Sequence, residues 1–318
     1  MVKIYNKYEM SYIRKMGNKD TNITENELVI LLPEGCMWAK DKKMKACSYC
    51  GYQALVDEMR STSEFDDYIE IIDHEMNKQA EMIERVSFFV GGSFLEIDRT
   101  ERNRFIEKMN EYPQVKEIFF ETRPELVTSK NVKELRERIP DKQLTVAIGL
   151  ESSDDYIRNV IHTKSITKKV FERAMKFLKD SGVEPLIYVF VKPPMENMTD
   201  EEAIKDALDT ITYSFDQGAT FIELECGYIV ENSEMHKLFL DGKYKTLSLW
   251  SIQKLLQEAI NKNRGIIRLA YFSDTPTPVE IPHNCGVCDE LFLTMFDTYR
   301  ETLDSGVINQ KIECSCVE

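Results

Sequence analysis

The stretch ELVILLPEGCMWAKDKKMKACSYCGY (27–52) joins an apolar run to a group of three cysteines. Its first part, ELVILLP (27–33), predicts a buried strand that ends at a proline. Cys36, Cys47 and Cys50 follow with the spacing C-x10-C-x2-C. We therefore expect them on a loop at the carboxyl end of that strand, where α/β enzymes place their chemistry.

Three thiols on one loop favour an iron–sulfur cluster over zinc. Each iron of a cubane cluster takes one cysteine thiolate, so three cysteines leave one iron open to bind a substrate. A structural zinc site prefers four protein ligands, and no further Cys or His lies within twenty residues of the loop. The sequence predicts a [4Fe-4S] cluster on Cys36, Cys47 and Cys50, with zinc as the alternative.

Length and composition indicate a globular chain. Its 318 residues, 42% of them apolar, are enough for one large α/β domain or two small ones. No run of eighteen apolar residues and no apolar N-terminal segment is present, so we expect a cytoplasmic protein without a membrane span. In that compartment its eight cysteines are expected to serve as metal ligands or catalytic thiols rather than disulfides.

The charge balance is acidic, with 55 Asp and Glu against 41 Lys and Arg and a net charge of −14. Most basic residues alternate with acidic ones, as on a solvated helix face, whereas proteins that bind nucleic acid usually carry a clustered basic patch. The one dense basic run is KDKKMK (40–45), inside the cysteine loop. It is expected either to contact a phosphate or to be solvated.

Six apolar runs alternate with helical segments through the middle of the chain. The predicted strands are 27–33, 85–96, 116–124, 144–152, 185–194 and 219–228. The predicted helices, in which apolar residues recur every three or four positions, are 57–84, 101–112, 129–139, 167–182 and 199–218. Nearly continuous apolar strands that alternate with helices predict a parallel sheet covered by helices.

This α/β alternation fits a partial (β/α)6 barrel of the TIM type over residues 25–230. A doubly wound sheet is the alternative, because periodicity does not separate the two. Residues 1–24 are then an N-terminal extension and 231–318 a Cys-rich C-terminal extension. The extension is predicted to contain helices at 249–263 and 290–306 and a strand-like run at 265–274.

Charged residues follow the third predicted strand. Glu121, Arg123 and Glu125 occupy alternate positions, so they are expected to share one face at the barrel mouth. We expect them there either to bind charged groups of a substrate or to form ion pairs with one another.

Two further strand ends carry charges. Lys192 ends the fifth predicted strand and either extends to the barrel rim or contacts a ligand. Glu223 and Glu225 share a face of the sixth strand, and burying them in a barrel interior without partners would be costly.

A second group of cysteines lies near the C-terminus. Cys285 and Cys288 form C-x2-C, Cys314 and Cys316 form C-x-C, and one predicted helix separates the pairs. Four thiolates in two close pairs predict a metal site, with free surface thiols as the alternative. Both Zn2+ and a second iron–sulfur cluster accept four cysteines, and His283 is a spare candidate ligand.

The cysteine loop, with Tyr49 directly before its last cysteine, resembles the cluster motif of radical S-adenosylmethionine (SAM) enzymes. The usual first spacing there is C-x3-C, so the ten residues between Cys36 and Cys47 are a departure. Over about residues 20–318 the chain resembles the elongator-like branch that contains the radical SAM enzyme of archaeosine biosynthesis. The strings that carry this resemblance are GCMW (35–38), CSYCGY (47–52), GSFLE (92–96), ETRPEL (121–126) and KPP (192–194).

The resemblance implies the open barrel and a set of cofactor-binding residues. Beside Tyr49, these are Gly91, Gly92 and Ser93 for the amino end of SAM, Glu151 for its ribose or amino group, and Arg158 or Lys164 for its carboxylate. Between Arg158 and Lys164 the choice stays open, because arginine is the better bidentate partner and Lys164 fits the family position better. Glu121, Arg123 and Lys192 are the candidate catalytic residues.

The resemblance also implies an activity. A reduced cluster binds SAM and cleaves it to methionine and a 5′-deoxyadenosyl radical, which abstracts hydrogen from a substrate in the barrel. In the archaeosine enzyme this cleaves a C–N bond of a lysine-modified deazaguanine in tRNA and leaves an amidine. A reductant such as flavodoxin or ferredoxin is implied, and a partner protein that presents the tRNA is compatible with the acidic charge. The alternatives are a radical SAM enzyme for a peptide or small metabolite, and a non-catalytic Fe-S or zinc protein.

Overall fold

The computed structural model describes residues 11–18, 24–41, 46–62, 69–79, 82–272 and 277–316. Most of the predicted basic run 40–45 and the middle of the predicted helix 57–84 lie outside these ranges. On either side of that gap the chain is helical, as predicted.

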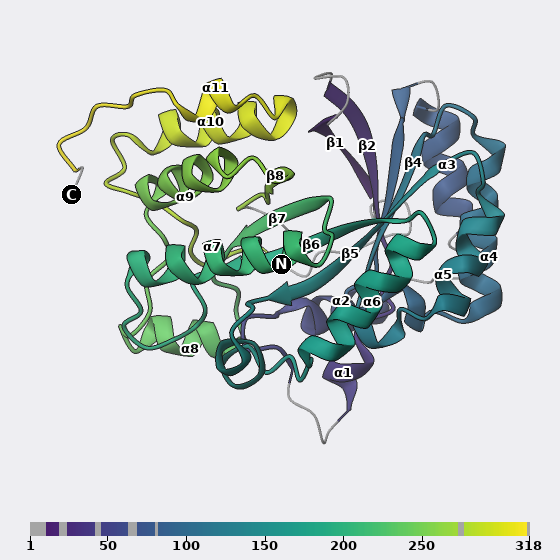
Figure 1. Ribbon diagram of the computed structural model, residues 1–318, viewed down its shortest axis with the longest axis horizontal. Helices are drawn as coiled ribbons and strands as arrows, with labels where there is room; N and C mark the ends of the chain where they lie inside the picture. Colours follow the sequence, from purple (N-terminus) through teal and green to yellow (C-terminus); the bar gives the residue numbers. More distant parts are fainter. Residues whose placement is uncertain are drawn as a thin grey trace.

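One eight-stranded sheet organises the molecule, and it curls into an open half-barrel (Figure 1). Its strands are β1 (Ser11–Gly17), β2 (Thr24–Leu31), β3 (Arg85–Phe89), β4 (Glu117–Thr122), β5 (Gln143–Glu151), β6 (Glu184–Val191), β7 (Phe221–Cys226) and β8 (Ile266–Leu269). Their order in the sheet follows their order in the chain. A doubly wound sheet would reverse that order at its switch point, so the barrel prediction is confirmed and the alternative was wrong.

The sheet extends on both sides of the predicted barrel strands. The strands from β2 to β8 are parallel, whereas β1 pairs antiparallel with β2, with Ser11 opposite Ile30. The two edges of the half-barrel are therefore β1, from the predicted N-terminal extension, and β8, from the predicted C-terminal extension. The strand-like run predicted at 265–274 is confirmed by β8.

Several of the helices begin at a capping side chain. They are α1 (Met37–Lys40), α2 (Tyr52–Thr62), α3 (Ile69–Gln79), α4 (Arg99–Lys108), α5 (Ser129–Arg138), α6 (Lys168–Asp180), α7 (Asp200–Asp216), α8 (Glu234–Leu240), α9 (Leu249–Asn261), α10 (Asp289–Thr302) and α11 (Ser305–Ile308). Thr128, Thr167 and Ser248 each accept a backbone N–H at a helix start, and Thr199 forms a capping box with Glu202 at α7. Within the described parts of the chain, no helix combines the length and apolar character needed to cross a membrane.

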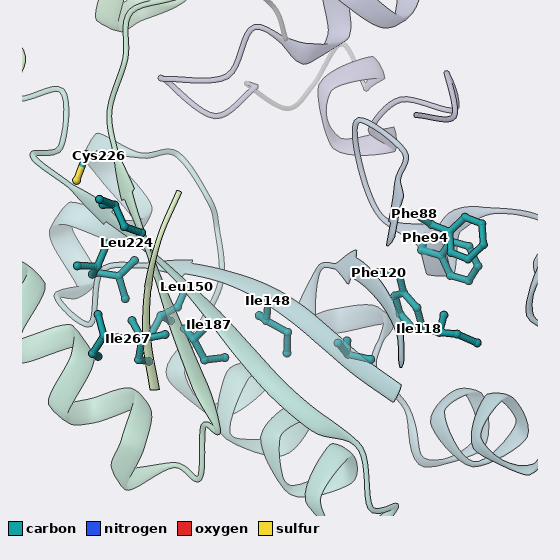
Figure 2. Close-up of a cluster of buried hydrophobic side chains, with 14 of the residues drawn as sticks. Phe88, Phe94, Ile118, Phe120, Ile148, Leu150, Ile187, Leu224, Cys226 and Ile267 are labelled. Atoms are coloured by element: carbon teal, nitrogen blue, oxygen red, sulfur yellow. The ribbon is translucent and has the colours of Figure 1, made fainter. Parts of the chain in front are cut away.

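The apolar core lies between the outer face of the sheet and these helices. Figure 2 shows it as a layer of side chains that crosses the sheet, labelled Phe88, Phe94, Ile118, Phe120, Ile148, Leu150, Ile187, Leu224, Cys226 and Ile267. Alternate residues of each strand face this layer, so the intervening residues face the barrel interior. Cys226 is part of this layer.

The barrel interior near the amino ends of β2, β3 and β4 contains buried charged side chains. The fully buried Glu27 carboxylate accepts from Arg14 at 2.6 Å and lies 3.2 Å from Arg85, which also pairs with Glu117 at 3.2 Å. Ser87 donates to the same carboxylate. Burial alone would raise the pKa of Glu27, but Arg14 and Arg85 lower it to about 2, so the carboxylate stays ionised. This network ties β1, β2, β3 and β4 together beneath the site.

The C-terminal helices close the side of the half-barrel. α10 contacts both edge strands, β1 and β8, and α9 packs between α7 and α11. In Figure 1 α10 and α11 lie beside α9, at the edge where β1 and β8 face each other. The incomplete barrel therefore has a helix across its seam.

Candidate functional site

A cavity of about 260 Å³ opens at the carboxyl ends of the parallel strands. Ten of the residues predicted for the cluster, the cofactor or the substrate line it: Cys36, Cys47, Tyr49, Cys50, Gly91, Gly92, Glu121, Arg123, Glu151 and Lys164. Four predicted residues, Ser93, Glu125, Arg158 and Lys192, are not among its lining residues. The fold thus brings these ten residues together although they are up to 128 positions apart in the sequence, from Cys36 to Lys164.

Gly91 and Gly92, which follow β3, allow the cysteine loop to pack closely against the end of this strand. A Cβ atom on Gly92 would lie 2.6 Å from the carbonyl oxygen of Gly35 and 2.7 Å from the Cα of Cys36. Gly91 has a φ of +64°, and a Cβ there would lie 2.7 Å from Val56. We predicted that this glycine pair lets the backbone approach a ligand. The structure adds that the pair lets β3 approach the backbone of the first cysteine, so only glycine fits.

The three loop thiols face the cavity together. Cys36 is held by its backbone N–H, which donates to Gln53 at 3.3 Å, while the next N–H, of Met37, donates to Glu96 at 3.0 Å. Burial raises the pKa of Cys50 to about 12 and also raises the pKa of Cys36. A bound metal would supply the positive charge that stabilises their thiolates. Three thiols that face one cavity therefore fit a cluster with three protein ligands.

Tyr49, Glu151 and Lys164 form a hydrogen-bonded group in the cavity lining. The Tyr49 hydroxyl donates to Glu151 Oε1 at 2.7 Å, and Lys164 Nζ donates to the same oxygen at 2.8 Å. Burial opposes the charge on Lys164, but Glu151 raises the pKa of the amine, which stays an ammonium. Glu151 has a φ of +67° and folds back over Gly149, where a Cβ would lie 2.7 Å from Lys164 Nζ. Gly149 is a site residue that the sequence analysis missed.

Arg123 links several predicted residues. Its guanidinium donates to Glu125 at 2.5 Å and to the carbonyl oxygen of Lys164 at 2.7 Å, and it lies 4.2 Å from the centre of the Trp38 ring. Its backbone N–H donates to Ser93 Oγ at 3.0 Å. The pairing with Glu125 is the alternative that the sequence analysis left open, while the position in the cavity wall leaves the guanidinium beside the cysteine loop.

Two predicted site residues, Arg158 and Lys192, do not line the cavity and form hydrogen bonds with other parts of the chain. Arg158 is fully buried, and its guanidinium donates to the carbonyl oxygens of Ile166 at 2.8 Å and Ser152 at 3.0 Å. Lys192 donates to Asp200 at 2.7 Å, at the start of α7. In this structure Arg158 braces the loop after β5 from inside, and Lys192 ties the end of β6 to a helix.

Part of the cavity lining, called here the acidic wall, carries three carboxylates. Glu121 from β4 and Glu223 and Glu225 from β7 line the cavity with Tyr188 from β6. Burial, followed by these three carboxylates, raises the pKa of Tyr188, so all of them lie within electrostatic range of its hydroxyl. This arrangement favours a cationic ligand group.

The N-terminal segment completes the cavity, which the sequence analysis missed. Tyr12 and Arg14 of β1 line it together with Tyr271, which follows β8. The signal was the spacing of Tyr12 and Arg14, which puts both on one face of a short strand.

The C-terminal cysteines form a second, separate site. The sulfur atoms of Cys285, Cys288, Cys314 and Cys316 all lie within 4.8 Å of one another. His283 does not belong to this group, and its Nδ1 lies 2.8 Å from a carboxylate oxygen of Glu280. The predicted convergence of the two pairs is confirmed.

Fold and site together define an α/β partial-barrel enzyme with a three-cysteine loop at the mouth. The family model described as "Radical SAM superfamily" matches residues 33–207, and the chain belongs to this superfamily. It is thus a radical SAM enzyme, and the family implies a [4Fe-4S] cluster and SAM.

Two curated relatives align with most of the chain. The chain is 28% identical to archaeosine synthase subunit beta of Methanosarcina acetivorans over 93% of its own length and 84% of that protein. It is 29% identical to the protein of the same name from Thermococcus kodakarensis, over 90% and 89% of the two chains.

Two solved structures share the fold at lower sequence identity. Elp3 of Methanocaldococcus infernus matches with a TM-score of 0.53 and 15% identity, over 71% of this chain and 57% of that one. The FeFe-hydrogenase maturase HydG of Carboxydothermus hydrogenoformans matches with a TM-score of 0.52 and 14% identity, over 76% and 53%. This chain therefore spans little more than half the length of both solved chains.

Proposed function

We propose that this chain is the radical SAM component of an archaeosine synthase-type enzyme. Its substrate is then a lysine-modified deazaguanine in tRNA, in which a C–N bond of the lysine side chain is cleaved to leave an amidine. The observation that carries the proposal is one cavity lined both by three cluster-type thiols and by three carboxylates. The names of two relatives aligned over most of their length support it.

Cys36, Cys47 and Cys50 are proposed to hold the [4Fe-4S] cluster. With SAM, such a cluster supplies a 5′-deoxyadenosyl radical, the reagent that abstracts hydrogen from substrates in this family. The chain's own residues position the reactants and exclude water from them. An external reductant such as flavodoxin or ferredoxin is proposed as the electron source.

Lys164 is the proposed partner of the SAM carboxylate. Its ammonium lines the cavity beside Tyr49, whereas the guanidinium of Arg158 is buried and bonded to two carbonyl oxygens. Glu151, which lines the same wall, is proposed to accept hydrogen bonds from the amino or ribose groups of SAM. Gly91 and Gly92 offer backbone groups at the same wall.

The acidic wall is proposed to hold the cationic part of the substrate. An ammonium group such as that of a lysine side chain gains charge-assisted hydrogen bonds from carboxylates in a partly buried cavity. Glu121 on β4 and Glu223 and Glu225 on β7 supply three carboxylates to this part of the cavity. Arg123, beside the cysteine loop, is proposed to contact an anionic group, and the predicted catalytic role of Lys192 requires the release of its bond to Asp200.

A partner is proposed to present the tRNA. The net charge of −14 does not favour binding of an RNA backbone by this chain alone, and the two relatives are named as subunits. A second subunit that carries the basic surface resolves this mismatch.

Anaerobic reconstitution with iron and sulfide, followed by SAM, dithionite and modified tRNA, tests the proposal. We expect 5′-deoxyadenosine to accumulate only when the tRNA carries the lysine adduct, and an amidine to appear in that tRNA. The chain alone should bind tRNA weakly and lose it steeply as salt rises. Turnover of a peptide or a free metabolite, with none of the modified tRNA, would replace the proposal by the alternative substrate class.

A further inference from the structure

The four C-terminal thiols form a compact polyhedron. Cys285 Sγ lies 4.0 Å from Cys288 Sγ and 3.6 Å from Cys314 Sγ. Cys316 Sγ lies 3.6 Å from Cys288 Sγ and 3.5 Å from Cys314 Sγ. The two pairs come from opposite ends of the segment that contains α10 and α11.

These separations are those of four ligands on a single ion. With a zinc–sulfur bond of about 2.3 Å, the sulfurs of a regular tetrahedron lie about 3.8 Å apart. Four of the six edges, 3.5 to 4.0 Å, bracket that value, and the other two are no longer than 4.8 Å. In a [4Fe-4S] cluster each thiolate binds a different iron, so the sulfurs would stand further apart. A disulfide bond, at about 2.05 Å, is far shorter.

We propose that Cys285, Cys288, Cys314 and Cys316 bind one Zn2+ in a closed tetrahedral site. All four positions are then filled by the protein, which is typical of a structural zinc site and leaves no position for a substrate. The proposal goes beyond the proposed function and does not depend on the substrate of the radical chemistry.

The surroundings of the thiols support metal-bound sulfur. Trp250 Nε1 on α9 donates to Cys316 Sγ at 3.5 Å, and Asn284 Nδ2 donates to Cys288 Sγ at 3.3 Å. The side-chain oxygen of Asn284 in turn accepts from the backbone N–H of Leu249 at 2.8 Å. N–H donors of this kind orient ligands and stabilise the charge that a thiolate carries toward its metal.

The site is placed where it can anchor the seam of the barrel. Cys288 directly precedes α10, and α10 contacts both edge strands, β1 and β8. Near the other end of α10, Arg300 donates to the carbonyl oxygens of Leu269 in β8 at 3.1 Å and Ala270 at 2.6 Å. There Thr24 of β2, the strand paired with β1, donates to the carbonyl oxygen of Glu301 at 2.8 Å. A metal at the start of α10 thus fixes the helix that joins β1 to β8.

Metal content is the first test. Zinc, iron and sulfide are measured in the variant Cys36→Ala/Cys47→Ala/Cys50→Ala, which lacks the cluster loop ligands. We expect about one zinc per chain without iron or sulfide. Iron with sulfide would replace the proposal by a second cluster, iron without sulfide by a single-iron site, and the absence of metal would overturn it.

Two variants show that the metal sits on these thiols. Cys314→Ser/Cys316→Ser should lose the zinc and keep the iron of the loop, whereas the matched control His283→Ala should keep both. If the double variant does not fold, Co2+ exchanged into the native protein gives the second measurement. Intense visible absorption of tetrahedral cobalt–thiolate supports the proposal, and an octahedral spectrum overturns it.

Hydrogen exchange tests the anchoring of the seam. Removal of the zinc should speed exchange in α10, β1 and β8 and leave the central strand β5 unchanged. Equal exchange of the edge strands with and without zinc would show that the metal holds only the tail.

Discussion

The loop after β2 and the C-terminal tail both present cysteine thiols, but in opposite surroundings. The loop thiols are three, and they open onto a cavity of about 260 Å³ that is shared with charged side chains. The tail thiols are four, lie within 4.8 Å of one another, and are not among the lining residues of that cavity. Ligand number and access, rather than residue type, separate a site that leaves a position for chemistry from one that is closed.

The two groups are also held in different ways. The loop rests on backbone, because Gly92 lets β3 approach Gly35 and Cys36 to distances that no side chain allows. The tail is held by side chains of α9, where Gln253 Nε2 donates to the carbonyl oxygens of Ile308 at 2.8 Å and Gln310 at 2.9 Å. The loop is thus fitted to the sheet, while the tail is fastened to a helix.

The largest effect should come from the loop. Replacing Cys36, Cys47 and Cys50 by Ala removes the ligands of the cluster, so reductive SAM cleavage should be abolished and about four irons per chain lost. The product 5′-deoxyadenosine is measured by chromatography after anaerobic incubation with dithionite. A triple variant that still cleaves SAM would break the distinction between the two cysteine groups.

The tail should instead affect stability. Cys314→Ser removes a ligand of the proposed zinc, and loss of about 3 kcal/mol would lower the melting temperature by roughly 6 °C in a chain of this size. Proteolysis should then begin in residues 309–316. SAM cleavage per folded molecule should match that of the native chain. A fall in that specific activity with unchanged melting would mean that the tail takes part in the chemistry.

Much of this contrast could be predicted from local patterns. The apolar run at 144–152 is long enough to be recognised as a buried strand, and β5 covers nearly the same residues. The tail cysteines are close in sequence within each pair, and a single helix between the pairs limits where they can meet. Patterns of this kind depend on residues that are neighbours in the chain.

The missed features depend on residues that are distant in the chain. Glu27 and Arg85 are charged residues in otherwise apolar strand sequences, and the sequence gives no sign that they pair. In the barrel interior they lie 3.2 Å apart. The sequence left the choice between Arg158 and Lys164 open, because arginine is the better bidentate partner and Lys164 fits the family position better. The structure separates them: Arg158 is buried in the π-helix Ile157–Ile161, and Lys164, which follows that helix, lines the cavity. No periodicity encodes this separation.

Lys164 marks a further difference between the loop site and the tail site. The loop cavity includes this lysine, whereas the tail site consists of four cysteines. Lys164→Met should weaken SAM binding about 10- to 100-fold, the effect of losing a charged hydrogen bond of about 1.5–3 kcal/mol. The dissociation constant is measured by equilibrium binding to the reconstituted protein.

Two variants control for lost structure at this position. Lys164→Arg keeps the charge and should recover most of the affinity. Lys176→Met, on the exposed face of α6, should bind SAM like the native chain. If Lys164→Met binds SAM normally, another cation holds the carboxylate.

The smallest effect is a pH dependence that belongs to the loop and not to the tail. His162 is fully buried, its ring 5.2 Å from that of Tyr49 in the loop and 5.1 Å from that of Phe190. Its two ring nitrogens have no hydrogen-bond partner among the described residues. Burial lowers the pKa of His162 to about 3, so the ring stays neutral in the folded protein.

The sign of the effect follows from proton binding. The unfolded chain, with a histidine pKa of about 6.5, binds this proton below that pH, while the folded chain does not until about pH 3. The contribution to stability is therefore complete above pH 6.5 and declines as the pH falls. Between pH 7 and pH 5 the stability lost from this contribution should amount to about 2 kcal/mol, at about 1.4 kcal/mol per pH unit.

Urea unfolding at both pH values should show the native chain losing that much more stability than His162→Leu, and the exposed-site control His283→Leu should follow the native chain. Equal losses in the native chain and His162→Leu would mean that the loop opens to admit the proton before the chain unfolds.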